Sequence, residues 1–135
     1  MKRFLLFILT ISLSSCYLAN GSPNSFIYWV KNNKKISFVD VKKCSKLSKK
    51  YVLNNKNKWE LYNELRNKFN EDPIKMINFN KEEYKQYENL VYKLEKNKNK
   101  CYYDLGYRFQ APLYWCLAQD GDNTKICIEN MKYRN

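Results

Sequence analysis

Five cysteines carry the most reactive side chains of this 135-residue chain. Cys16 lies just after an apolar stretch near the start, and the other four are Cys44, Cys101, Cys116 and Cys127. Four cysteines can form two disulfides in three ways. They could instead bind zinc, but they lack the closely spaced CxxC pairs that are typical of such sites. Two disulfides are therefore favoured, and no metal or other cofactor is expected.

The chain contains no histidine. This excludes Ser-His-Asp and Cys-His catalysis and zinc sites with His ligands, and it removes the usual general base near neutral pH. Glu82 and Glu83 are adjacent carboxylates, but capping and the helix dipole explain them in the first turn of a predicted helix. The stretch Asp120-Gly121-Asp122-Asn123 resembles a fragment of a calcium loop without its spaced third ligand and distal glutamate, so it predicts a plain turn. Nothing in these residue types favours an enzyme.

Two stretches have the apolar spacing of amphipathic helices. Residues 58–69 place apolar side chains on one side at steps of three and four, and Asn70 to Pro73 ends this helix. A second helix begins at Asn80 as its N-cap, with Glu83 as the capping-box partner. Phe79 is expected to staple onto Tyr84, and the stretch 97–100 ends the helix. Both apolar stripes are interpreted as core-facing.

The remaining apolar stretches predict strands. Residues 26–30 and 36–41 are rich in aromatic and β-branched residues, and Asn32-Asn33 between them can take the positive φ of a tight turn, which predicts a hairpin. Residues 102–109 are aromatic but interrupted by Gly106. Residues 113–119 and 124–131 flank the turn signal at 120–123 and predict a second hairpin.

The register of that second hairpin explains two of the cysteines. It places Cys116 opposite Cys127, at a separation that a disulfide tolerates, and Leu117 opposite Ile126. Trp115 and Ile128 then share the apolar face with Leu117 and Ile126. This register favours the pair Cys116–Cys127, which leaves Cys44–Cys101. The expected fold is a single α+β domain over residues 26–135.

The first sixteen residues have the features of an export signal. Lys2 and Arg3 precede an apolar run from Phe4 to Leu13, which is too short to span a bilayer as a helix. The run ends in Leu13-Ser14-Ser15-Cys16, which resembles the lipobox of bacterial lipoproteins. The resemblance covers this segment alone. It implies that residues 1–15 are a signal peptide, that Cys16 is lipidated, and that residues 16–25 form a tether.

The same resemblance implies a location. Lipoproteins kept in the inner membrane commonly have Asp after the cysteine, whereas this chain has Tyr17, so the outer membrane is expected, with the protein facing the periplasm or the exterior. The alternative is cleavage by a conventional signal peptidase before Ser22, after the small residues around Ala19 and Gly21, which would release a secreted protein. Both interpretations place the mature chain in an oxidising compartment, where disulfides persist.

The chain is strongly basic, with 25 Lys and Arg against 13 Asp and Glu and a formal charge of +12. Nearly all of this charge is lysine, whereas base and phosphate recognition favours arginine, so no nucleic-acid partner is expected. A basic surface would instead attract lipid head groups, acidic envelope polymers or an acidic protein. A merely solvated basic surface is an equally good interpretation.

Aromatic residues supply the second candidate binding feature. Tyr and Trp are enriched at binding interfaces, and an aromatic cluster surrounds one arginine in the C-terminal part. The candidate patch consists of Tyr102, Tyr103, Tyr107, Arg108, Phe109 and Tyr114. Aromatic filling of a small core is the alternative, and it is favoured over the patch.

These observations predict a small membrane-anchored lipoprotein that acts as a non-catalytic binding module in the cell envelope, of the capture, inhibition, immunity or exclusion type. A structural or assembly accessory of the envelope is the second hypothesis. An envelope hydrolase that uses carboxylates is the third and least favoured one.

Overall fold

The computed structural model describes residues 22–118 and 121–135. The predicted signal segment, Cys16 and Asp120 of the predicted turn therefore lie outside the described residues. The predicted α+β class is confirmed, because helices are combined with a three-stranded antiparallel sheet of order β2-β1-β3. The strands are β1 (Trp29–Lys31), β2 (Lys34–Lys35) and β3 (Arg108–Phe109).

The N-terminal hairpin is present and its turn is the predicted one, but its second strand is β2 and not the predicted stretch 36–41. Asn32 and Asn33 have φ values of 50° and 59°, as the turn between β1 and β2 requires. Residues 26–28, the start of the first predicted strand, belong to a 3₁₀ helix, η1 (Ser25–Tyr28). The second predicted strand, 36–41, is wrong, because α2 (Phe38–Val52) begins there. Ser37 caps this helix by accepting a hydrogen bond from the backbone N–H of Asp40 at 3.1 Å, and this cap outweighs the β propensity of the stretch.

Helix α2 packs along α5 (Lys81–Asp104), the longest helix described. The predicted disulfide Cys44–Cys101 joins the two helices, with 5.6 Å between the Cα atoms. The buried hydroxyl of Ser48 donates to the carbonyl of Leu94 at 2.6 Å. The predicted end of this helix at residues 97–100 is wrong. Burial of Tyr102 in the core keeps the chain helical through the polar stretch.

Helices α3 (Lys56–Glu71) and α4 (Pro73–Asn78) form a projecting arm with the start of α5. The predicted helix over 58–69 is confirmed by α3, whose Tyr62 and Leu65 are buried. Asn80 occupies the N-cap position of α5 but makes no capping bond to the backbone. Phe79 is 80% exposed rather than packed on Tyr84, whose ring stacks on Phe69.

The C-terminal hairpin is the main error of the sequence-based interpretation. Residues 113–116 and 123–130 form helices α6 (Leu113–Cys116) and α7 (Asn123–Asn130), yet the predicted disulfide Cys116–Cys127 forms between them, with 5.7 Å between Cα atoms. The buried residues of α7 follow the helical period at 123, 127 and 130. Trp115 is buried as predicted, whereas Leu117 and Ile128 are exposed.

Of the stretch 102–109, only residues 108 and 109 form a strand. Helix α5 continues to Asp104, and the chain then turns at Gly106, whose φ of +90° is readily available only to glycine. Strand β3 follows and pairs Phe109 with Trp29. Trp29 is the centre of the main core, with the rings of Tyr102 and Phe109 at 5.3 and 5.5 Å.

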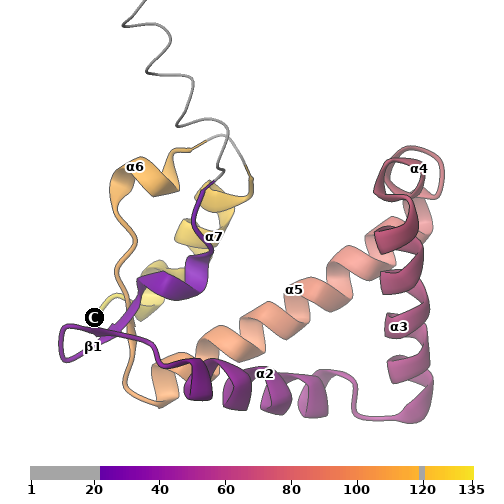
Figure 1. Ribbon diagram of the computed structural model, residues 1–135. Helices are drawn as coiled ribbons and strands as arrows, with labels where there is room; N and C mark the ends of the chain where they lie inside the picture. The colour runs from indigo at the N-terminus through magenta and orange to yellow at the C-terminus, as the bar shows by residue number, and fades with distance from the viewer. Residues whose placement is uncertain (1–21, 119–120) are drawn as a thin grey trace, which may run out of the picture.

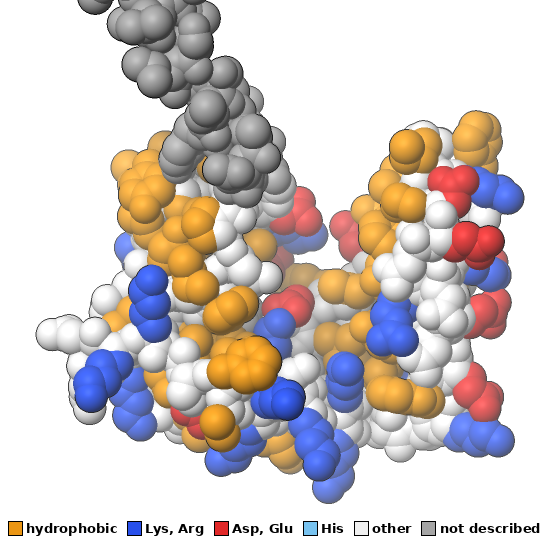
Figure 2. Space-filling view, in the orientation of Figure 1, with side chains coloured by type: hydrophobic (Ala, Val, Ile, Leu, Met, Phe, Trp, Pro, Cys, Tyr) orange, Lys and Arg blue, Asp and Glu red, His pale blue; other side chains and the backbone are white. Residues whose placement is uncertain are grey.

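The elements form a two-pronged shape (Figure 1). The sheet, α6, α7 and the final 3₁₀ helix η2 (Met131–Tyr133) make a lobe on one side. Helices α2 and α5 cross the base, and the arm rises on the other side. The space-filling view shows a hollow between lobe and arm (Figure 2). The disulfide between α2 and α5 therefore links the two helices from which both prongs extend.

Candidate functional site

Half of the predicted aromatic patch lies in the core. Tyr102, Tyr107 and Phe109 are only 0%, 7% and 2% exposed, so they cannot contribute to a binding surface. The reason is topological: the end of α5 and strand β3 enclose Trp29, and these side chains fill the space around it. For these three residues the core-filling interpretation is the correct one.

The other three residues of the patch do not form one cluster. The Arg108 guanidinium lies 4.3 Å from the ring centroid of Tyr103, close enough for a cation–π contact, and the ring of Tyr133 lies 5.1 Å from that of Tyr103. Tyr114 is 66% exposed but lies on α6. The structure thus brings Arg108 and Tyr103 together and adds Tyr133, which the sequence interpretation did not include.

Among the described helices, α2 has the largest excess of basic over acidic side chains. This helix carries five lysines and a single acidic residue, Asp40, within 15 residues. Lys43, Lys46 and Lys50 are all exposed and lie three and four residues apart, so they share one side of the helix. We call these three residues the lysine face. Lysine and arginine side chains line the lower edge of the molecule, below α2, in Figure 2.

The single carboxylate of α2, Asp40, offsets only part of this charge. It accepts hydrogen bonds from the hydroxyls of Ser37 and Tyr107. These bonds hold the pKa of Asp40 below its usual value, and the bond from Tyr107 has the larger effect of the two. Asp40 is therefore ionised at neutral pH and attracts Lys43, but five lysines against one carboxylate leave α2 cationic.

A groove of about 460 Å³ runs beside the lysine face, between α2 and the last turns of α5. Lys43 belongs to both features. Leu47 and Tyr51 give the groove an apolar wall on α2, and Tyr51 is 70% exposed. Lys100 of the groove is paired with Asp104 at 2.6 Å, and this bond raises the pKa of Lys100. We call this feature the α2–α5 groove; its complete lining is Lys43, Leu47, Ser48, Tyr51, Asn97, Lys100, Cys101, Asp104 and Leu105.

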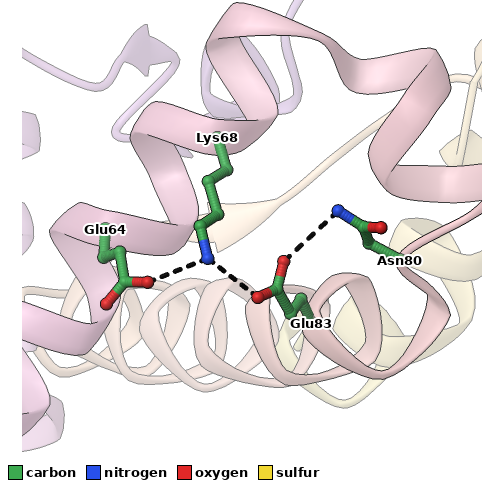
Figure 3. Close-up of polar contacts among 4 residues, drawn as sticks. All are labelled: Glu64, Lys68, Asn80 and Glu83. Atoms are coloured by element: carbon green, nitrogen blue, oxygen red, sulfur yellow. Dashed lines mark hydrogen bonds and ion pairs between the residues drawn. The ribbon is translucent and has the colours of Figure 1, made fainter.

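A second polar feature lies in the arm, where Lys68 of α3 is placed between two carboxylates (Figure 3). Its Nζ atom lies 2.9 Å from Glu64 and 2.8 Å from Glu83 of α5, and the amide of Asn80 donates to Glu83 at 3.5 Å. The bonds to Glu83 and Glu64 raise the pKa of Lys68 well above its usual range. An ammonium held in this way cannot act as a base or nucleophile near neutral pH. The cluster ties α3 to α5 and borders a pocket of about 510 Å³.

The described residues contain no group of three or more Cys, Asp or Glu side chains arranged to hold a metal ion. Gly121 and Asp122 of the stretch that resembles a calcium-loop fragment lie in a bend, and Asp122 occupies the N-cap position of α7. The plain-turn interpretation fits these two positions.

Exposed apolar side chains gather at the ends of both prongs, which the sequence interpretation missed. On α4 and just after it, Ile74, Ile77 and Phe79 are 70%, 42% and 80% exposed. On the lobe, exposed apolar residues surround the Cys116–Cys127 disulfide and border an apolar pocket of about 260 Å³; they are Leu113, Leu117, Ile128 and Met131, with Tyr114 beside them on α6. Ile74 and Ile77 lie between the two predicted helices and belong to neither apolar stripe, a signal that was available from the sequence.

No helix within residues 22–118 and 121–135 is long and apolar enough to cross a membrane. Comparisons of the chain with protein-family models, with curated proteins and with solved structures found no match.

Proposed function

We propose that this chain is a small lipoprotein of the bacterial cell envelope, anchored through Cys16, that binds an acidic envelope component without catalysis. The binding surface is the lysine face together with the α2–α5 groove. The observation that carries the proposal is the combination on α2 of five lysines against a single carboxylate and a neighbouring groove with an exposed aromatic wall.

This combination suits recognition of an acidic partner. Lysines on one helix side attract an anionic partner over a distance and increase its rate of association. The Tyr51 ring and the Leu47 side chain in the groove offer the apolar contact that lowers the dissociation rate once the partner is seated. The disulfide Cys44–Cys101 fixes α2 against α5, so the groove is preformed and little entropy is lost on binding.

The envelope location is supported by two independent features. The stretch Leu13-Ser14-Ser15-Cys16 resembles a lipobox, and the other four cysteines pair as disulfides, which persist in oxidising compartments. Two or more acyl chains on Cys16 would anchor the protein stably.

The anchor is tested by metabolic labelling with a fatty acid in a bacterial host. The wild-type chain should incorporate the label and Cys16→Ala should not. A mature wild-type protein that carries no label and begins at Ser22 would show that the chain is secreted instead.

The binding surface is tested with purified protein immobilised on a matrix and incubated with an envelope extract. Replacing the lysine face by glutamine (Lys43, Lys46 and Lys50) should remove the acidic component that the wild type retains. The matched control replaces three exposed lysines on one side of α5, Lys85, Lys93 and Lys96, and causes the same loss of charge. Equal losses of binding in both triple variants would mean that net charge, and not this surface, governs binding.

A further inference from the structure

The first described residues of the chain are fixed on helix α6. The indole Nε1 of Trp115 donates to the carbonyl of Pro23 at 2.8 Å, and the ring of Tyr28 lies 4.9 Å from that of Trp115. Trp115 itself is only 2% exposed, so this contact belongs to the core. The chain therefore enters the folded domain at α6.

Exposed apolar residues cover the surface of the lobe around this entry point. Leu113, Tyr114 and Leu117 are 71%, 66% and 62% exposed, and Ile128 and Met131 on the neighbouring segment are 65% and 59% exposed. The apolar pocket of about 260 Å³ is bordered by four of these five residues. An apolar surface of this kind marks a contact with a protein or a membrane. We call these five residues the α6 surface.

The tip of the arm repeats this composition. Phe79 and Ile74 are 80% and 70% exposed, with Lys75 and Lys81 exposed beside them. In Figure 1 the arm tip at α4, the α6 helix and the point where the chain enters the lobe all lie toward the upper side of the molecule, while α2 lies along the lower side. Hydrophobic side chains also cap the arm in Figure 2.

The length of the chain between Cys16 and the folded domain limits the distance between the anchor and the α6 surface. Cys16 and Ser22 are six positions apart, and a fully extended chain spans at most about 3.6 Å per residue, or about 20 Å in all. A lipidated Cys16 therefore holds Ser22 within about 20 Å of the bilayer. Pro23, the next residue, contacts Trp115 of α6, so the α6 surface is within reach of the bilayer.

We propose that the α6 surface and the arm tip, Ile74, Ile77 and Phe79, are two contacts with the lipid bilayer. The protein then stands on the membrane on both prongs, with the lysine face of α2 directed to the aqueous side. Apolar side chains insert at the head-group boundary, and the flanking Lys75, Lys81 and Arg134 complement anionic head groups. The orientation rests on the proposed anchor at Cys16, whereas the two lipid-contacting surfaces are properties of the folded domain.

The test places a photo-crosslinking phenylalanine derivative at one position at a time in the mature chain. Tyr114 and Phe79 probe the two prongs, and Tyr51 on α2 is the matched control, since it is 70% exposed, close to the 66% of Tyr114. The chain is coupled through the Cys16 thiol to maleimide lipids in phosphatidylethanolamine–phosphatidylglycerol vesicles, so that the result does not depend on natural lipidation. Fatty-acid labelling of the wild type reports separately on the anchor.

We expect lipid adducts at positions 114 and 79 and at least fivefold fewer at 51. Adding Leu117→Asp should reduce adducts at 114, and adding Ile74→Asp should reduce those at 79; both positions are exposed, so folding is preserved. Adducts at 51 as frequent as those at 114, or adducts at only one prong, would overturn the two-point contact. Lipid adducts in coupled protein together with unlabelled wild type would instead retain the contact surfaces and reject the natural anchor.

Discussion

The phenolic oxygen of Tyr107 lies 2.6 Å from Oδ2 of Asp40, which joins the chain just before β3 to the first turn of α2, 67 positions away. Ser37, the N-cap of α2, donates to the same carboxylate oxygen at 2.9 Å. Because both donors stabilise the charged carboxylate, they hold the pKa of Asp40 below its usual value of 3.8. The bond to Asp40 in turn raises the pKa of Tyr107. This bond fixes the lobe against the start of the lysine-bearing helix.

The Tyr107–Asp40 bond predicts a pH dependence of stability. A carboxylate whose pKa is lowered by folding stabilises the folded state above its unfolded pKa, and this stabilisation is lost as the pH falls through the folded pKa. Tyr107→Phe removes the main cause of the shift. The variant should therefore be less stable than wild type at pH 7, and the difference should shrink below about pH 3.8. Urea unfolding from pH 7 to pH 2.5 measures this; a difference that stays constant with pH would show that the lost stability comes from packing.

For a second tyrosine, Tyr102, replacement by Phe is not expected to reduce stability. Tyr102 is fully buried, and its hydroxyl has no hydrogen-bond partner in the part of the chain that the structure describes. Burial also raises its pKa. An unpaired buried hydroxyl carries a desolvation cost of roughly 1–3 kcal/mol, so Tyr102→Phe should leave the free energy of unfolding unchanged or increase it by about 1 kcal/mol. Denaturant unfolding at pH 7, beside Tyr107→Phe as the comparison, measures both. A loss of stability in Tyr102→Phe would reveal a partner for that hydroxyl.

The two disulfides should differ in their contribution to stability. Their sequence separations are 57 for Cys44–Cys101 and 11 for Cys116–Cys127. On the chain-entropy estimate the longer loop contributes about 4 kcal/mol and the shorter about 3 kcal/mol. Replacing both cysteines of the α2–α5 pair by alanine should also leave a cavity between the two helices, since Cys44 is fully buried. Thermal unfolding of the two double variants tests the order. A larger loss in the Cys116/Cys127 variant would contradict the estimate.

Local signals in the sequence predicted the parts of the fold that depend on them. The turn at Asn32-Asn33, the helix over 58–69 and the start of the helix at Asn80 each rest on residues within one turn of each other, and all three are present. The predicted apolar stripe of α3 is buried at Tyr62 and Leu65, whereas its members Trp59 and Leu61 are exposed.

In the C-terminal segments, local sequence signals do not decide between strand and helix. Residues 113–131 contain apolar residues that fit either a period of two or a helical period, and the strand interpretation also pairs Cys116 with Cys127. Two short helices bring the same cysteines to 5.7 Å, so the disulfide does not decide between them. Burial of Trp115 and Cys127 against the core selects the helices, and this packing involves Pro23 and Tyr28, which are distant from Trp115 in sequence.

For the candidate site too, local features were visible in the sequence, whereas features that depend on long-range packing were not. Aromatic composition predicted a surface that the fold places largely inside, because burial of Tyr102 and Phe109 depends on the pairing of β1 with β3. The lysine content of α2 was visible in the sequence. Its arrangement on one side depends on α2 being a helix, and the β propensity of residues 36–41 predicts a strand at the place where that helix begins.

The lysine face predicts a salt-dependent affinity. The screening length of an aqueous solution falls from about 30 Å at 0.01 M to about 8 Å at 0.15 M ionic strength, so an exposed cationic surface attracts an anion less strongly at the higher value. Fluorescently labelled polyglutamate is a suitable acidic probe. Its affinity for the wild type should fall by at least tenfold between these two ionic strengths. Glutamine at Lys43, Lys46 and Lys50 should flatten this dependence more than glutamine at Lys85, Lys93 and Lys96. Titration by fluorescence anisotropy at both ionic strengths measures how the affinity of each variant changes with salt. Binding that does not change with salt would assign recognition to the apolar wall of the α2–α5 groove, at Leu47 and Tyr51.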